Sequence, residues 1–155
     1  MLAANFPMTA AKIRKAAIRL ATRRQFIQEA RFRQLQADAL GASHFHIPPI
    51  DGRVRPVSDS LQINLRQLDA AQIESFLSHC KRRGMPVGLF GSADNARNFR
   101  NWQYSPIATD VEKTEAMIKA AIDVRLPLSF EDADFDQMGA VLLAALDDTL
   151  NGEEA

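Results

Sequence analysis

The sequence has only one cysteine, one tryptophan and one tyrosine among its 155 residues. The single cysteine, Cys80, excludes an internal disulfide and a cysteine-rich metal site. It lies in an apolar helical stripe, where we expect a buried and inert thiol. No run of 18 apolar residues occurs, and Lys12, Arg14 and Lys15 interrupt the first apolar stretch. We therefore expect no membrane span and no signal peptide, but a cytoplasmic protein.

Familiar catalytic and phosphate-binding motifs are also missing. The sequence contains no G-x-x-x-x-G-K-[ST], no G-x-G-x-x-G and no G-x-S-x-G, so neither a phosphate-cradling loop nor a nucleophile elbow is predicted. Asp132, Asp134 and Asp136 imitate the start of a calcium loop. We reject this site because Gln137 and Leu143 stand where glycine and glutamate are needed.

Two histidines, His44 and His46, lie on the same side of a segment predicted to be extended. Two imidazoles in this arrangement are suited to a metal ion, but no third ligand is near in sequence. The remaining histidine, His79, is predicted to lie on a helix beside its buried face. Surface or packing roles are therefore favoured over a zinc site.

The net charge of zero conceals a strong asymmetry. Residues 1–40 carry eight Lys or Arg against Glu29 and Asp38, whereas residues 129–155 carry eight acidic groups and no basic one. The two segments can attract each other within the fold, or one of them can address a partner. The hydrophobic content of 46% and the length fit one ordinary globular domain.

Hydrophobic periodicity predicts three parts. A long basic linking helix covers residues 1–41, an α/β small domain covers 42–150, and a frayed tail covers 151–155. We expect an α/β (α+β) fold, with a small mixed sheet of about three to four strands flanked by helices. In the small domain, the expected elements are strands at 58–65, 85–90 and 122–128, and helices that begin at capping boxes Asp69/Gln72, Thr109/Glu112 and Ser129/Asp132.

The segment FGSADNARNFRNWQY, residues 90–104, has no clear helical or strand period. Arg97 and Arg100 are candidates for holding a carboxylate or phosphate by paired N–H bonds. Trp102 and Tyr104 are candidates for a flat apolar wall and one hydroxyl group. The alternative for all four residues is packing and surface solvation. Arg125, alone in an apolar strand, is expected to be edge-exposed or paired with a buried acid such as Asp123 or one on the last helix, in a structural role.

The basic helix also suggests a nucleic-acid hypothesis, since its eight cations could neutralise phosphates and the loop aromatics could stack on bases. We disfavour this hypothesis because the total charge is nil and no binding motif matches. Ile13, Leu20 and Ile27 form an apolar stripe that needs a partner. If exposed, this stripe should drive self-association.

Three stretches carry a family resemblance: AQIESFLSHCKRRGMPVGLFG, RNFRNWQY and IDVRLPLSFEDADFDQMGAVL. Together they resemble the C-terminal part of the DegT/DnrJ/StrS family, which are fold type I pyridoxal-phosphate aminotransferases, many acting on nucleotide sugars. The resemblance implies the fold of the small domain of these enzymes. It also implies that the 90–104 loop lies beside a substrate cleft.

The same resemblance limits what the chain can do alone. In the family the cofactor lysine, the aspartate on the pyridine nitrogen and the phosphate-binding groups lie upstream of the matched region. The five lysines here lie on predicted helices, and none has the Ser-x-x-Lys surroundings followed by glycines that mark the cofactor lysine; they are Lys12, Lys15, Lys81, Lys113 and Lys119. We expect no catalytic residue and no bound cofactor in this chain alone, with pyridoxal phosphate held by a missing large domain or second subunit.

One departure concerns specificity. Sugar aminotransferases of the family commonly carry a His-Tyr-Pro-like segment where this sequence has residues 90–104. Their sugar specificity is therefore not carried over. The alternative to the aminotransferase hypothesis is a non-enzymatic binding or adaptor domain, whose basic N-terminal helix docks on an acidic partner or on nucleic acid.

Overall fold

The computed structural model describes residues 27, 29–31, 33–36, 42–54, 59–103, 110–127 and 129–152. A four-stranded sheet lies at its centre, with the order β1-β2-β4-β3. The strands are β1 (Phe45–His46), β2 (Ser60–Leu65), β3 (Gly88–Leu89) and β4 (Ala121–Arg125). Every pair of neighbours is antiparallel. The α/β class and the number of strands are therefore confirmed.

The direction of the strands differs from the mixed sheet that we expected. Strands β2 and β3 run in the same direction, as predicted for a strand-helix-strand unit, but β4 lies between them. The two parallel strands consequently never pair with each other. The result is a split β-α-β arrangement in which each pairing is antiparallel.

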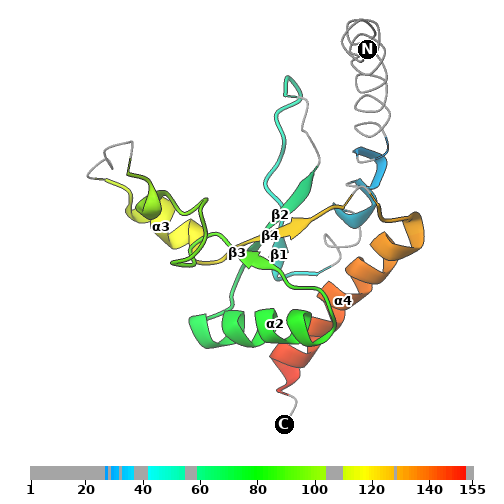
Figure 1. Cartoon of the computed structure of the whole chain (residues 1–155). Coiled ribbons are helices and arrows are strands. Elements are labelled where there is room, and N and C mark those ends of the chain that lie inside the picture. Colours follow the sequence, from blue (N-terminus) through cyan, green and yellow to red (C-terminus); the bar gives the residue numbers. More distant parts are fainter. Residues whose placement is uncertain are drawn as a thin grey trace, which may run out of the picture.

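Two helices cover one face of the sheet. Helices α2 (Ala70–Arg82) and α4 (Asp132–Asn151) pack against each other below the strands (Figure 1). Helix α3 (Glu112–Ile118) and the 3₁₀ turn η1 (Phe99–Asn101) lie on the β3 side of the sheet (Figure 1). The opposite face of the sheet is therefore not covered by α2 and α4.

The hydrophobic core lies between this covered face and the two helices. In β2 the residues Leu61, Ile63 and Leu65 are buried and alternate with polar neighbours, as the predicted half-buried strand requires. Across the core the rings of Phe45 and Phe76 meet edge to face, with centroids 5.9 Å apart. The other fully or nearly fully buried apolar residues are Leu35, Ile47, Ile73, Cys80, Ile122, Val124, Leu126, Phe135, Met138, Leu142, Ala145 and Leu146.

Local signals fix the ends of α2. Asp69 accepts from the Gln72 backbone N–H, and the Gln72 side chain accepts from the Asp69 N–H, which confirms the predicted capping box. After the helix Gly84 has φ 81°, a left-handed conformation that glycine adopts without strain. On the buried side of α2, Cys80 is fully buried as predicted, and burial raises the pKa of its thiol to about 12.

Other predicted boundaries were wrong by a few residues. Helix α4 begins with a capping box of Glu131 and Asp134, because the backbone turn at Pro127 continues past Ser129. The β4 strand ends at Arg125, before the proline. Helix α3 has Val111 at its N-cap and no side-chain cap. The predicted cap Thr109 lies outside the described residues, as does Leu128.

The N-terminal segment is described only in part. The described residues between 27 and 36 are helical, and Leu35 is fully buried in the core. Arg31 lies with its Nε 3.1 Å from Asp132 of α4 and its guanidinium over the Phe135 ring. One basic group of this segment therefore pairs with the acidic last helix, which is one of the two alternatives that the charge asymmetry left open. The remainder of the predicted 1–41 helix and residues 153–155 lie outside the described part.

Candidate functional site

Three asparagines at three-residue spacing hold the loop that follows β3. The side-chain amides of Asn95, Asn98 and Asn101 each donate to backbone carbonyls of the loop or of β3, over 2.8 to 3.2 Å. Asn98 is buried, and its Oδ1 also accepts from the backbone N–H of Arg100 at the start of η1. The loop is thus a bonded part of the fold. The repeat N-x-x-N-x-x-N is the sequence signal of these bonds.

A glycine brings this loop against α3. The Gly91 N–H donates to the carbonyl of Ile118 at 2.8 Å. A Cβ at this position would lie 2.9 Å from the same carbonyl oxygen, closer than side-chain atoms tolerate. The contact therefore requires glycine, and it fixes the loop beside the end of α3.

Arg97 extends from the loop to the uncovered face of the sheet. Its Nη1 lies 2.9 Å from Oδ2 of Asp123 in β4, and its guanidinium lies over the Phe90 ring, 5.8 Å from the centroid. The side chain is 37% exposed. A guanidinium held between a carboxylate and an aromatic ring has a restricted orientation, while part of it still reaches solvent.

Asp123 lies at the centre of this arrangement. It is only 7% exposed, and Arg125 places its Nε 3.0 Å from the same Oδ2 that Arg97 approaches. Arg125 also lies 3.6 Å from Asp59. Of the alternatives predicted for Arg125, the structure shows pairing with Asp123, while 57% of the Arg125 side chain is exposed. The sequence did not identify Asp123 as a common partner of two arginines, because Arg97 reaches it only through the fold. We call Asp123, Arg97 and Arg125 the Asp123 cluster.

The strand register defines the surroundings of the Asp123 cluster. Gln62 of β2 and Gly88 of β3 are the partners of Asp123 across the two neighbouring strands. Directly paired residues share a face of the sheet, so both flank Asp123 on the face opposite α2 and α4. Gln62 is exposed and Gly88 has no side chain. We call this side, with Gln62, Asn64, Asp123 and Arg125, the open face.

The other predicted residues of the loop lie elsewhere. Arg100 forms an ion pair with Glu115 of α3 and stacks on Phe99, so the structure does not bring Arg100 and Arg97 onto one carboxylate. Trp102 is 40% exposed, and its indole N–H donates to the carbonyl of Ala96 at 3.0 Å. Tyr104 lies outside the described residues.

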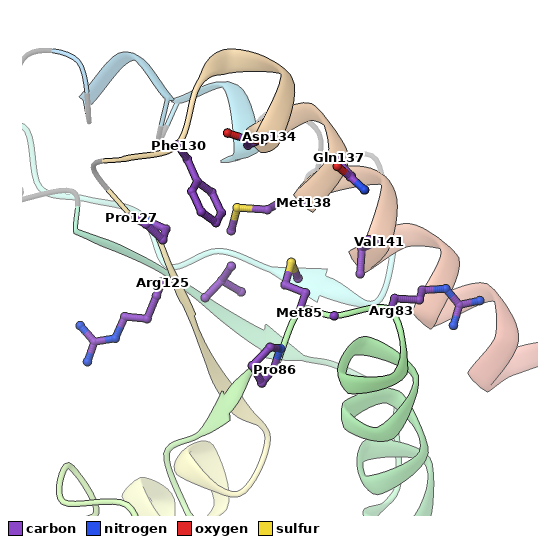
Figure 2. A pocket seen from close by; sticks show the side chains of 12 residues that line it. Arg83, Met85, Pro86, Arg125, Pro127, Phe130, Asp134, Gln137, Met138 and Val141 are labelled. Atoms are coloured by element: carbon purple, nitrogen blue, oxygen red, sulfur yellow. The ribbon is translucent and has the colours of Figure 1, made fainter.

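A cavity of about 450 Å³ opens on the covered side of the sheet, between the start of α4 and the segment before β3 (Figure 2). Its apolar walls include Met85, Pro86, Phe130 and Met138. It lies where β3 stops pairing with β4 at Gly88, after a proline that has no N–H to donate. Arg125 also lines this cavity, and Figure 2 shows its guanidinium pointing away from the apolar walls.

The described residues bear on two kinds of site, a cofactor-binding lysine and a metal site. Lys81, Lys113 and Lys119 are exposed, and none of them lines the cavity. They do not fit the role of a cofactor-binding lysine. In the described ranges no group of three His, Cys, Asp or Glu could hold a metal ion, so His44 and His46 have no third ligand there. Among the described helices, none combines the length and apolar character that a membrane crossing requires.

The fold, a split antiparallel sheet with two helices on one face, is similar to part of a solved structure. The neighbour is the apo form of a protein from Streptococcus pneumoniae, provisionally designated a sugar aminotransferase, with a TM-score of 0.59 and 9% sequence identity. The match covers 83% of this chain and 32% of that chain, so this chain spans about a third of the neighbour. No family model and no curated protein matches. At this identity the likeness establishes the fold alone.

Proposed function

We propose that this chain acts as the small C-terminal domain of an aminotransferase-like protein related to the DegT/DnrJ/StrS family. The observation that carries the proposal is that 83% of the chain matches about a third of a structure designated a sugar aminotransferase. The family resemblance of three stretches in the sequence points in the same direction. The chain contributes substrate contacts, and a separate part contributes the chemistry.

The loop at residues 90–104 is the proposed contact with substrate. Its asparagine bonds fix the backbone, so Arg97 and Trp102 are presented from a rigid support. Arg100 on η1 and Tyr104 complete the proposed set. Rigid presentation matters because a side chain that is ordered before binding loses less entropy when the substrate arrives.

The cofactor belongs to the other part of the proposed assembly. Transamination needs a lysine that bonds covalently to pyridoxal phosphate, and the three described lysines are exposed, Lys81 and Lys113 on helices and Lys119 just after α3. We therefore expect a partner, either a large domain of the same protein or a separate subunit.

Co-expression with a cofactor-binding part tests the proposal. The gene immediately upstream is the first candidate, if it encodes a pyridoxal-phosphate lysine but no small domain. We expect a stable complex that stays yellow through gel filtration, whereas this chain incubated with pyridoxal phosphate alone stays colourless. Arg97→Ala should leave the complex and its colour intact while it lowers turnover of substrate, and Arg53→Ala, on an exposed turn, should change neither. A stable complex without pyridoxal phosphate would instead favour the adaptor hypothesis.

A further inference from the structure

The two arginines of the Asp123 cluster approach one oxygen of the carboxylate and leave the other unused. Arg97 Nη1 and Arg125 Nε lie 2.9 and 3.0 Å from Oδ2. Oδ1 is buried and has no hydrogen-bond partner within the part of the chain that the structure describes. Buried carboxylate oxygens normally accept hydrogen bonds, so this arrangement does not use the full capacity of Asp123.

A second arginine–aspartate pair in the same chain shows the alternative geometry. Arg53 donates from Nε to Oδ1 of Asp51 at 2.9 Å and from Nη2 to Oδ2 at 2.6 Å. One arginine is thus sufficient to occupy both oxygens of an aspartate. At Asp123 neither arginine does so, because each shares Oδ2 with the other.

A single arginine has enough donors to bond both oxygens of Asp123. If Arg97 leaves, Arg125 can shift to bond both oxygens, as Arg53 does at Asp51. The unused Oδ1 then gains the donor that it lacks now. Arg97 is the arginine suited to leave because it extends from the loop, and its guanidinium is only partly covered.

The surroundings favour an anionic group as the incoming ligand. Both guanidiniums reach solvent, with 37% of Arg97 and 57% of Arg125 exposed. Gly88 beside Asp123 has no side chain to cover the arginines, and a Cβ placed there would contact only the Asp123 backbone oxygen, at 3.9 Å. A flat guanidinium matches the paired oxygens of carboxylates and phosphates.

We propose that Arg97 binds the phosphate or carboxylate group of a small ligand. Without ligand, Arg97 is paired with Asp123; when the ligand binds Arg97, Arg125 bonds both oxygens of Asp123 instead. Asp123 and Arg125 are positioning residues in this scheme. The idea rests on the proposed function for placing substrate at this loop. Its test needs only this chain, so the two proposals can fail separately.

Calorimetric titration of the chain with inorganic phosphate and with acetate, at constant ionic strength, measures this site. We expect binding of at least one probe, and the stronger probe identifies the class of ligand. Arg97→Ala should weaken it by at least about tenfold, the value of one lost charge-assisted hydrogen bond. Arg53→Ala, whose arginine is almost fully exposed, is the matched control and should bind as the original chain does.

Substitutions of the two positioning residues, Asp123 and Arg125, should change the affinity for the probe in opposite directions. Asp123→Asn removes the carboxylate that competes for Arg97, so it should bind the probe several-fold more tightly. Arg125→Ala leaves Arg97 as the sole partner of Asp123 and should weaken binding. In the Asp123→Asn background, Arg125→Ala should have little effect, because no carboxylate remains to be occupied. Melting curves of each variant identify any loss of folding.

Three outcomes overturn the proposal. One is that neither probe binds the chain, and another is that Arg97→Ala binds as well as the original chain. The third is that Arg125→Ala weakens binding equally with and without the Asp123 carboxylate, since Arg125 would then act only through its charge. A yellow complex with the cofactor-binding part would leave the proposed function standing in each case.

Discussion

The two faces of the sheet follow one alternating pattern but are stabilised in different ways. The covered face carries Leu61, Ile63 and Val124, packed under α2 and α4. The open face carries Gln62 and Asp123, and the latter is buried by arginines from β4 and from a loop. Burial on the covered face excludes water from hydrocarbon, whereas burial on the open face depends on paired charges. The two faces should therefore respond differently to mutation.

Truncation on the covered face should have the largest effect. Phe76 is fully buried, and its ring lies against Phe45. Phe76→Ala leaves a cavity that these rigid elements cannot fill, and we expect a loss of about 3–5 kcal/mol in the free energy of unfolding. Urea denaturation measures it. Phe130→Ala, at a residue that is already 36% exposed, is the matched control and should cost clearly less. Equal losses would mean that the covered face is not the principal core.

Loss of charge on the open face should have a smaller effect. Asp123→Ala leaves two guanidiniums without their carboxylate, but both are partly exposed and can be hydrated. We expect a loss of about 1–3 kcal/mol in the free energy of unfolding, which is the usual cost of removing the partner of a buried hydrogen-bonding group. The loss should fall in high salt, because screening already weakens these pairs. A loss as large as that of Phe76→Ala would contradict the distinction between the faces.

The covered face could be predicted from the sequence, since its signals are local. The alternation of Leu61, Ile63 and Leu65 and the Asp69 capping box depend on near neighbours in the chain. The β3 strand is shorter than the predicted 85–90, and Pro86 in this range has no N–H to donate to a neighbouring strand. The Asp123 cluster could not be predicted in full, because Arg97 and Asp123 meet only after β4 enters between β2 and β3. Sequence periodicity predicts the face of the sheet on which a residue lies. It does not predict which charged residue, distant in the sequence, will pair with it.

The asparagine bonds of the loop should contribute less than either face. Asn98→Ala removes two donated bonds and the acceptor for the Arg100 N–H. We expect a loss of about 1–2 kcal/mol. The sole tryptophan, Trp102, lies at the end of this loop, so its fluorescence should also shift toward that of the unfolded chain. Asn151→Ala removes one exposed side-chain bond on α4 and should change neither property. An unchanged spectrum in Asn98→Ala would mean that the loop is held by other contacts.

The smallest effect concerns the exposed pair that contrasts with the Asp123 cluster. Hydrogen bonds from the Arg53 side chain, and then from its backbone N–H, lower the pKa of Asp51 to about 2. A lowered pKa in the folded state adds stability above the ordinary pKa of about 3.9, and this stability is lost as the pH falls through about 2. Since the pair is exposed to solvent, the change in stability should be too small to detect by unfolding, so an NMR titration of the Asp51 carboxyl is the measurement.

Arg53→Ala should raise the midpoint of the Asp51 titration only part of the way, because the backbone N–H remains. Arg66→Ala, on the exposed surface after β2, should leave it unchanged. A midpoint near 3.9 in the original chain would show that Arg53 does not occupy both oxygens in solution, and the comparison with Asp123 would then lose its reference.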